Sequence, residues 1–256
     1  MMPTLHDSSA RLAVFVFGNY HIQAEGRFTR PPVHLLRVLI FVLLEGKGRP
    51  VLRQRIRDLL WSDFASEQAG ADFRQAMARI RKFQEENNIE LLSTDSQNVW
   101  VNLNQDMYVD LAEFVELAAN YRQKGCVRMC EIHRGDLLET QSSAGKGFEE
   151  WLAIKRTDLL RGLNNAVSHA LQFEIELTAQ ERHFCASRLL RMDPCHEGAH
   201  RALMSDAAAK GQFSYVKQLF DAYSWQLYEE LGLEPSDDTV RLYHELTAQG
   251  PEPLGR

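Results

Sequence analysis

Several features that would mark a secreted, membrane-spanning or disulfide-bonded protein are missing from these 256 residues. The four cysteines form no CxxC pair and are too sparse for a secreted scaffold, so we expect reduced thiols. The most hydrophobic run, residues 35–44, is about half the length of a membrane span and carries Arg37. Residues 1–10 are polar and have no apolar core of the kind found in signal peptides. These absences predict a cytoplasmic protein without a membrane segment.

Signatures of catalysis are also scarce. The glycines of Gly46-Lys47-Gly48 end a predicted helix and do not fit the phosphate-binding pattern GxxxxGK[ST]. The sequence offers no paired nucleophile and base of the kind that covalent catalysis needs. We therefore predict that the protein is not an enzyme and binds no cofactor.

Two short patterns could in principle hold a metal ion. The segment His196-Glu197-Gly198-Ala199-His200 matches HExxH, in which two imidazoles one helical turn apart bind zinc and the glutamate acts as a base. A protease of that kind also needs a third ligand and a strand beside its substrate, whereas every neighbouring segment is predicted helical. Cys126, Cys130 and His133 similarly share one predicted helical face. In both cases packing between helices is the better interpretation, and we predict no metal site.

Charge is divided unevenly along the chain. Residues 1–104 contain 13 Lys and Arg against 11 Asp and Glu, while residues 105–256 contain 16 against 24. The overall charge of −6 argues against indiscriminate nucleic-acid binding, but the N-terminal part can still present a local basic face. The acidic remainder is better suited to protein partners.

The N-terminal part has the element order of a winged helix. Residues 13–17 and 20–23 predict two short strands, and Pro31-Pro32 precedes a helix over residues 33–45. A second helix is expected over residues 52–61, and a third follows the polar loop 62–68 over residues 69–86. Leu91-Leu92 and residues 99–103 then form a predicted hairpin around the turn 95–98.

The third predicted helix separates apolar from polar side chains. Its core face carries Phe73, Ala76, Met77, Ile80 and Phe83. The opposite face carries small residues and an amide, with cations at its edges: Ala71, Gln75, Ala78 and Lys82, flanked by Arg74, Arg79 and Arg81. Small side chains allow close approach to a major groove, Gln can pair with adenine, and Arg and Lys can bind phosphate or guanine. On charge alone, an ordinary solvated helix face would explain the same pattern.

The C-terminal part is predicted to be all helical, with helices over residues 110–123, 126–133, 148–177, 179–192, 195–210, 213–231 and 237–248. Small and large apolar residues alternate in a way that is typical of stacked helical hairpins. The Ser- and Gly-rich residues 141–147 predict a loop. Phe220, Tyr223, Trp225 and Tyr228 could line a concave surface, although at least half of them are expected in the core.

These motifs together resemble the Streptomyces antibiotic regulatory protein family, in which an OmpR-type winged helix precedes a bacterial transcriptional activator domain. The winged-helix marks are Pro31-Pro32, LLRVLIFVLLEGKGRPV from Leu35, Leu60-Trp61-Ser62-Asp63, and residues 73–82. The marks of the second domain are Tyr108-Val109-Asp110 with Phe114, Arg134-Gly135-Asp136-Leu137-Leu138, Phe148-Glu149-Glu150-Trp151-Leu152 with Arg156, Asp193-Pro194 with Glu197, His200 and Arg201, and residues 230–236. One departure is Ser62, because the family commonly has Pro after the Trp.

The resemblance implies a mostly α protein with a small β part, formed by a winged helix over residues 11–104 and a helical-repeat domain of the tetratricopeptide type over residues 105–250. It implies a sequence-specific transcriptional regulator that binds double-stranded DNA at promoter repeats, pairs there as a homodimer and recruits RNA polymerase. The residues expected to face DNA are Arg74, Gln75, Ala78, Arg79 and Lys82, with Arg53 and Asn98 on phosphates. Asp63 and Glu67, in the loop 62–68, are the expected polymerase contacts.

Two other functions stay open from the residues themselves. In the first, the helical repeats act as an adaptor for protein partners, and no specific DNA site exists. In the second, a small effector binds in the repeat groove or near Asp110 and alters pairing on DNA.

Overall fold

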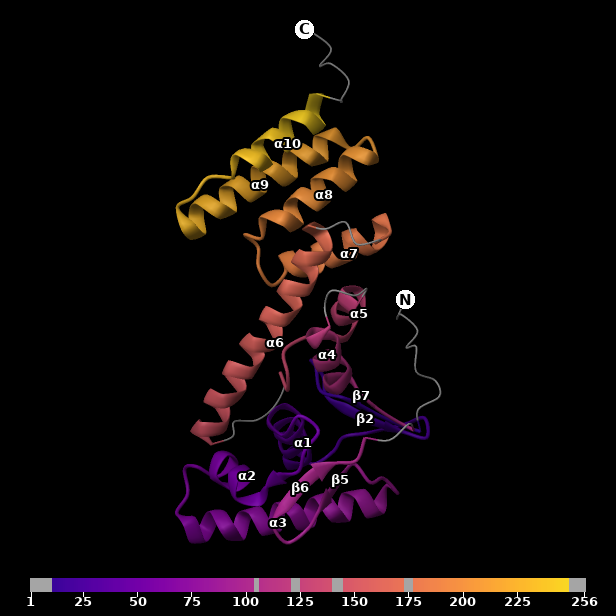
Figure 1. Ribbon diagram of the computed structural model, residues 1–256, viewed down its shortest axis with the longest axis vertical. Coiled ribbons are helices and arrows are strands. Elements are labelled where there is room, and N and C mark those ends of the chain that lie inside the picture. Colours follow the sequence, from indigo (N-terminus) through magenta and orange to yellow (C-terminus); the bar gives the residue numbers. More distant parts are fainter. Residues whose placement is uncertain (1–10, 104–105, 121–124, 140–144, 173–176, 249–256) are drawn as a thin grey trace. The chain divides into compact units, whose positions relative to one another are not determined.

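The computed structural model describes residues 11–103, 106–120, 125–139, 145–172 and 177–248 (Figure 1). Their packing divides the chain into two compact units, which are considered separately. The first comprises the described parts of residues 1–116 and 132–159, and the second comprises those of residues 117–131 and 160–256. No helix in the described ranges is both long and apolar enough to cross a membrane.

The first unit begins with a four-stranded sheet of order β3-β2-β1-β7. Its strands are β1 (Leu12–Phe15), β2 (His21–Ala24), β3 (Arg27–Thr29) and β7 (Met107–Val109). The first three pair in antiparallel fashion, whereas β7 lies parallel to β1 with Met107 opposite Leu12. The sequence did not predict β3 or β7, because three residues are too few to show alternation and the partner of β7 lies far upstream.

The predicted winged-helix order is confirmed. It consists of α1 (Val33–Gly46), β4 (Val51–Leu52), α2 (Arg53–Leu60), α3 (Ser66–Glu86), β5 (Leu92–Thr94) and β6 (Asn98–Val101), with the three strands in the order β4-β6-β5. The buried α1 accounts for the hydrophobic run, and α3 packs against both α1 and α2 (Figure 1). The prediction that α3 starts at residue 69 was wrong. It starts at Ser66, so Glu67 lies in its first turn and not in a loop.

Residues that follow the winged helix in the sequence complete the first unit. The buried Asp110 carboxylate accepts hydrogen bonds from the backbone N–H groups of Val16 and Phe17, at 2.9–3.2 Å. Leu137 forms a bridge with Phe17 just beyond β1. The first part of α6 (Lys146–Gln172) also belongs here. The boundary between residues 104 and 105 therefore remains a prediction, since chain on both sides of it builds one compact unit.

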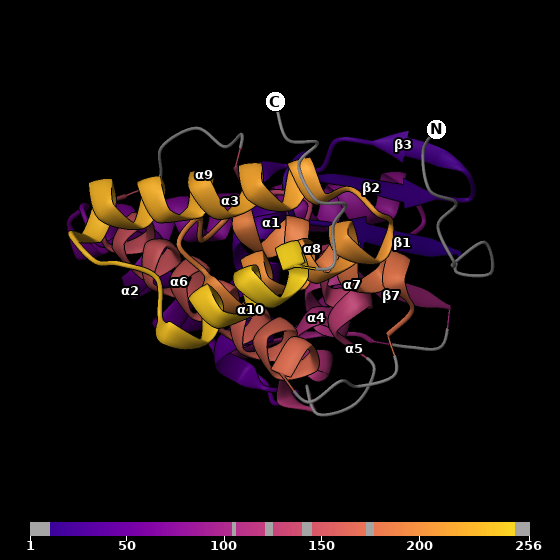
Figure 2. The same cartoon turned by 90° about the horizontal axis from the view of Figure 1, so that it is seen from above.

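The described part of the second unit is built from helices. It contains the end of α4 (Asp110–Ala119), most of α5 (Gly125–Ile132), the second part of α6, and then α7 (Ala179–Leu190), α8 (Glu197–Ala209), α9 (Phe213–Leu231) and α10 (Asp237–Ala248). The last four helices pack on their neighbours in chain order and form the stacked hairpins that the sequence predicted, which Figure 2 shows from above. The predicted extension of α6 through residues 173–176 lies outside the described residues.

Details of the repeats refine the prediction. The prediction that α8 starts at residue 195 was wrong, because His196 is the N-cap and the first helical residue is Glu197. Tyr223 is buried, and Phe220 packs into the core with its ring stacked on Tyr243 at 4.1 Å. Trp225 and Tyr228 are exposed, at 63% and 65%. The expectation that at least half of the four aromatic residues belong to the core is therefore confirmed.

Candidate nucleic-acid interface

The exposed face of α3 gathers most of the predicted DNA contacts. Phe73, Ala76, Met77 and Ile80 are buried, whereas the opposite face leaves exposed Arg74, Gln75, Ala78, Arg79, Arg81 and Lys82. Lys82 is near Glu86 one turn later, at 3.7 Å in an exposed ion pair. Such a pair is weak and can be exchanged for a phosphate. The sequence thus correctly divided the helix into two faces, while the role of the exposed face stays a prediction.

Arg53 and Asn98, the predicted phosphate contacts, both form hydrogen bonds with Asp95 in the β5–β6 hairpin, which is the wing. Arg53 donates to the carbonyl oxygen of Asp95 at 2.9 Å, and its guanidinium lies 5.3 Å from the centre of the Phe73 ring. The Asp95 carboxylate accepts from the backbone N–H groups of Gln97 and Asn98 at 2.7 and 2.6 Å. Those two hydrogen bonds are the main cause of the lowered pKa of Asp95. Arg53 and Asn98 therefore shape the wing turn, and contact with phosphate remains a prediction for both.

Gln84 fixes the β5–β6 hairpin to α3, a role that the sequence analysis did not predict. The buried side chain accepts from the backbone N–H groups of Leu91 and Leu92 at 3.0 and 2.7 Å, and it donates to the carbonyl oxygen of Leu92 at 3.0 Å. Gln84 stands on the same helical stripe as Phe73, Met77 and Ile80. A polar residue on an apolar stripe was the signal that could have identified it.

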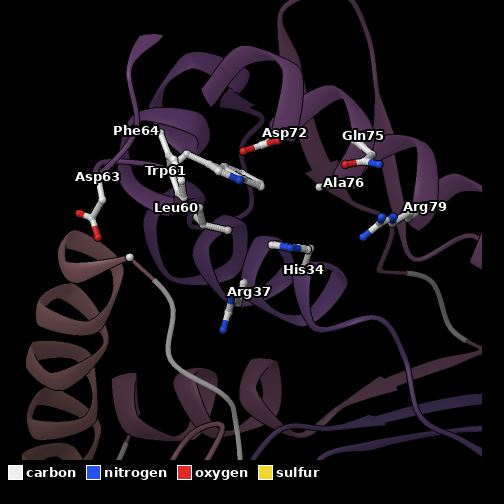
Figure 3. A pocket seen from close by; sticks show the side chains of 11 residues that line it. His34, Arg37, Leu60, Trp61, Asp63, Phe64, Asp72, Gln75, Ala76 and Arg79 are labelled. Carbon is white, nitrogen blue, oxygen red and sulfur yellow. The ribbon is translucent and has the colours of Figure 1, made fainter. Parts of the chain in front are cut away.

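A surface cavity of about 450 Å³ lies beside this face, between α1, α3 and the turn after α2 (Figure 3). Gln75 and Arg79 line it from α3, and the rings of His34 and Trp61 stack at 5.2 Å on its other side. Burial, followed by the charges of Arg37 and Arg79, lowers the pKa of His34. We therefore expect a neutral imidazole at physiological pH.

The structure separates the two predicted polymerase contacts. Asp63 lies in the turn between α2 and α3, as Figure 3 shows. Its carboxylate accepts a hydrogen bond from the backbone N–H of Lys146 at 2.8 Å. Glu67 is exposed on the first turn of α3. Asp63 thus has a partner within the chain, and contact with polymerase stays a prediction for both residues.

The HExxH pattern has a structural explanation in the second unit. The Nδ1 atom of His196 accepts from the N–H of Ala199 at 3.1 Å as the cap of α8, and its Nε2 atom is 2.7 Å from the hydroxyl of Ser168. His200 donates from Nε2 to the carbonyl oxygen of Pro194 at 2.8 Å. Both ring nitrogens of His196 are therefore occupied, and burial lowers the pKa of both imidazoles.

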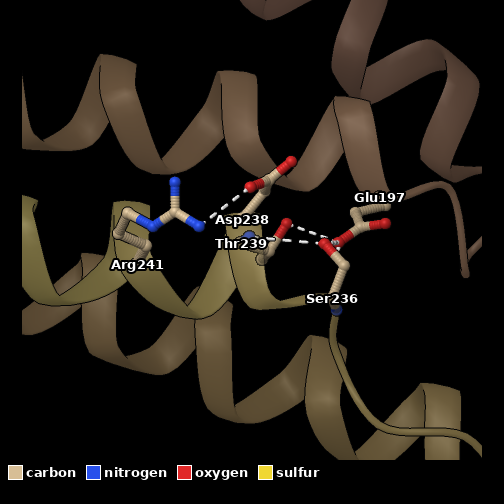
Figure 4. Close-up of polar contacts among 5 residues, drawn as sticks. All are labelled: Glu197, Ser236, Asp238, Thr239 and Arg241. Atoms are coloured by element: carbon tan, nitrogen blue, oxygen red, sulfur yellow. Dashed lines mark hydrogen bonds and ion pairs between the residues drawn. The ribbon is translucent and has the colours of Figure 1, made fainter.

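Glu197, the would-be base of that pattern, connects α8 to α10 (Figure 4). Its carboxylate accepts from the backbone N–H of Ser236 at 3.2 Å and from the hydroxyl groups of Ser236 and Thr239. Burial raises the pKa of Glu197, but these hydrogen bonds outweigh it and the pKa is lowered. The residue therefore holds the start of the last helix.

The predicted cysteine and histidine face is divided between the two units. Cys126 and Cys130 lie buried on α5 with Cys185 of α7, and hydrogen bonding to Cys185 together with burial raises the pKa of Cys126. Past the end of α5, His133 packs in the first unit against Phe17, with ring centres 5.3 Å apart. Within the described ranges, no group of three or more His, Cys, Asp and Glu is arranged to hold a metal ion.

The fold consists of a winged helix, with the exposed basic face on α3, followed by stacked helical hairpins. Comparisons with known proteins identify the family. A model of the bacterial transcriptional activator domain matches residues 109–247. The chain therefore belongs to the bacterial transcriptional activator domain family, and with its N-terminal winged helix it is a transcriptional regulator of the Streptomyces antibiotic regulatory protein type. The resemblance deduced from the sequence motifs is confirmed.

One solved structure shares the fold over nearly the whole chain. It is Mycobacterium tuberculosis EmbR in complex with a low-affinity phosphopeptide, with a TM-score of 0.62 and 17% sequence identity. The alignment covers 95% of this chain and 66% of that one, so this chain spans just under two thirds of the length of EmbR. A search of curated proteins found no match.

Proposed function

We propose that this regulator binds double-stranded DNA in a sequence-specific manner, with α3 in the major groove and the β5–β6 hairpin beside it. The observation that supports this proposal is the composition of the exposed face of α3, where four cations surround Gln75 and Ala78 on a helix whose opposite face is buried. Small side chains and an amide at the centre favour contact with base edges, and flanking cations favour phosphates.

The direct test is fluorescence-anisotropy titration of the purified chain with DNA from upstream of its own gene, at physiological salt with excess competitor DNA. We expect saturable binding that resists competition and is lost in Arg74→Glu. Lys217→Glu, which makes the same change of charge at an exposed position on α9, serves as the control for charge. Binding that disappears in competitor and is equal in all three proteins would refute the proposal.

Individual residues on α3 have different expected effects. Lys82→Ala should weaken binding to every sequence and reduce its salt dependence, because a lysine on a phosphate reads no base. Gln75→Ala should mainly relax the preference at one position of the site. Equal losses on all sequences would exclude Gln75 as a reader of bases.

Transcription activation would follow from recruitment of RNA polymerase by the turn between α2 and α3 together with the first turn of α3. Run-off transcription with Glu67→Lys tests this, because Glu67 is exposed and its reversal leaves the Asp63 contact with α6 in place. Activation should fall while DNA binding is kept. Full activation by Glu67→Lys would remove this residue from the polymerase surface.

Pairing of two copies on adjacent half-sites would compensate for the modest positive charge of one winged helix. Two weak modules held side by side gain through effective concentration. A titration of single and double half-sites should show at least about ten-fold tighter binding to the double site. Equal affinity per half-site would indicate independent monomers.

The helical unit supports a second candidate function, the binding of a partner or small effector. A groove of about 810 Å³ runs over α6, α7, α8 and α10. Its lining includes three guanidinium groups and three carboxylates, from Arg182, Arg201, Arg241, Glu197, Asp238 and Glu245. A ligand held there would raise the melting temperature of the chain. Thermal-shift screening with charged metabolites and peptides tests this function, and an unchanged melting temperature throughout would count against it.

A further inference from the structure

The turn after α2 contacts the first residues of α6, although more than 80 positions separate them in the sequence. The carboxylate of Asp63 accepts from the backbone N–H of Lys146 at 2.8 Å. The hydroxyl oxygen of Ser62 accepts from the N–H of Gly147 at 3.2 Å. The first N–H groups of a helix have no partner within the helix, so these two side chains cap α6 from outside it.

The glycines at the start of α6 make this approach sterically feasible. A Cβ atom on Gly147 would lie 2.7 Å from the Ser62 hydroxyl oxygen, and one on Gly145 would lie 3.2 Å from the Asp63 carboxylate. By contrast, a Cβ atom on Gly162, later in the same helix, would be at an ordinary 3.5 Å from Ala118. The sequence suggested these two glycines only as part of a loop. Their lack of a side chain leaves the space that Ser62 and Asp63 occupy.

A second set of contacts holds the same part of α6 against α1. Glu45 accepts from the indole N–H of Trp151 at 3.0 Å and from the ammonium group of Lys155 at 2.8 Å. The Trp151 ring lies 5.3 Å from that of Phe41, and the Arg37 guanidinium lies 5.6 Å from the ring of Phe148. The start of α6 is thus firmly attached to α1 and can serve as a fixed point for the turn.

We propose that Ser62 and Asp63 are positioning residues for α3, which they hold by anchoring the turn before it to the N-terminus of α6. Residues 62–65 are all exposed, so the turn has little packing of its own, and α3 begins only three residues after Asp63. Fixing the turn limits the positions that the first half of α3 can take. This inference rests on the proposed DNA-binding function for its consequence, but the contact itself can be tested without DNA.

Hydrogen–deuterium exchange of the full chain tests the contact. In Asp63→Ala, the amides of residues 146–149 should exchange about five-fold faster, as expected for loss of a cap. Asp63→Asn keeps an acceptor oxygen and should exchange nearly as the natural chain does. Asp58→Ala is the matched control, because it removes a neighbouring carboxylate whose hydrogen-bond partner is Arg57. Unchanged exchange in Asp63→Ala would refute the cap.

DNA affinity then tests the positioning role, because the two explanations predict opposite signs. Removing a carboxylate near DNA should strengthen binding slightly for electrostatic reasons, and Asp58→Ala reports that effect. If Asp63 positions α3, Asp63→Ala should instead bind its specific site about two- to five-fold more weakly, with recovery in Asp63→Asn. Binding by Asp63→Ala that equals binding by Asp58→Ala would refute the positioning role. If the natural chain binds no specific site, the proposed function fails, while the exchange result still decides the cap.

A pair of glycine substitutions gives an independent test that leaves the Asp63 carboxylate and the Ser62 hydroxyl group in place. Gly147→Ala should lower the melting temperature by roughly 2–10 °C and speed exchange at residues 146–149, because its methyl group collides with Ser62. Gly162→Ala, in the same helix, should leave both unchanged or raise the melting temperature, since Ala favours helix. Equal behaviour of the two variants would show that the close approach to Ser62 does not exist.

Discussion

Replacement of Glu197 by Ala is expected to be among the most destabilising single changes in the helical unit. The carboxylate accepts three hydrogen bonds from Ser236 and Thr239 at the start of α10. Thr239 is fully buried, so its hydroxyl would be left without its carboxylate acceptor. An unsatisfied buried polar group costs about 1–3 kcal/mol.

The two bonds from Ser236 add to this cost. Each is more exposed than that of Thr239 and contributes about 0.5–1.5 kcal/mol. The total loss for Glu197→Ala is therefore about 2–6 kcal/mol, which corresponds to a fall in melting temperature of roughly 5–20 °C. Glu197→Gln keeps an acceptor oxygen at the same place and should lose about half as much.

Urea unfolding followed by circular dichroism provides the measurement, with Glu229→Ala as the control because Glu229 is an exposed carboxylate on α9. The control should change the free energy of unfolding by less than about 0.5 kcal/mol. A loss in Glu197→Ala no larger than that of the control would refute the role assigned to these hydrogen bonds. The lowered pKa of Glu197 also predicts that this stabilisation is fully present above the ordinary value of 4.5 and is lost as the pH falls through the lower folded-state pKa.

Three further predictions concern other polar side chains. Gln84→Ala should reduce the free energy of unfolding by about 2–4 kcal/mol, because two wing N–H groups lose their acceptor, and chemical denaturation would show it; Gln97→Ala in the exposed turn is the control. Burial, opposed by backbone N–H donors, raises the pKa of Asp110 to about 7. A group whose pKa is raised by folding stabilises the folded state most at low pH. The free energy of unfolding should therefore decrease as the pH rises through about 7, and this pH dependence should be absent in Asp110→Asn. His196→Ala should cost about 1 kcal/mol as the loss of a helix cap, measured by thermal unfolding, and addition of zinc should leave the melting temperature of the natural chain unchanged.

The sequence was sufficient for the order and type of the main elements. The winged helix and the successive helical hairpins follow from apolar periodicity over segments of eight residues or more, in which local preference and burial agree. The same periodicity correctly divided α3 into a buried and an exposed face, because helical geometry alone determines which residues share a side. Family membership also followed from motifs in a fixed order.

The contacts between distant segments depended on the tertiary structure. Strand β7 has only three residues, and its pairing with β1 cannot be deduced from local pattern. Likewise, a carboxylate can contact RNA polymerase, cap a helix or remain in solvent, and the residue type alone does not distinguish these roles. Asp63 caps α6 and Glu197 secures α10 because chain folding places a helix N-terminus or buried hydroxyl beside each of them. The sequence by itself determined which faces exist, and only the packing of remote segments decided which polar groups those faces meet.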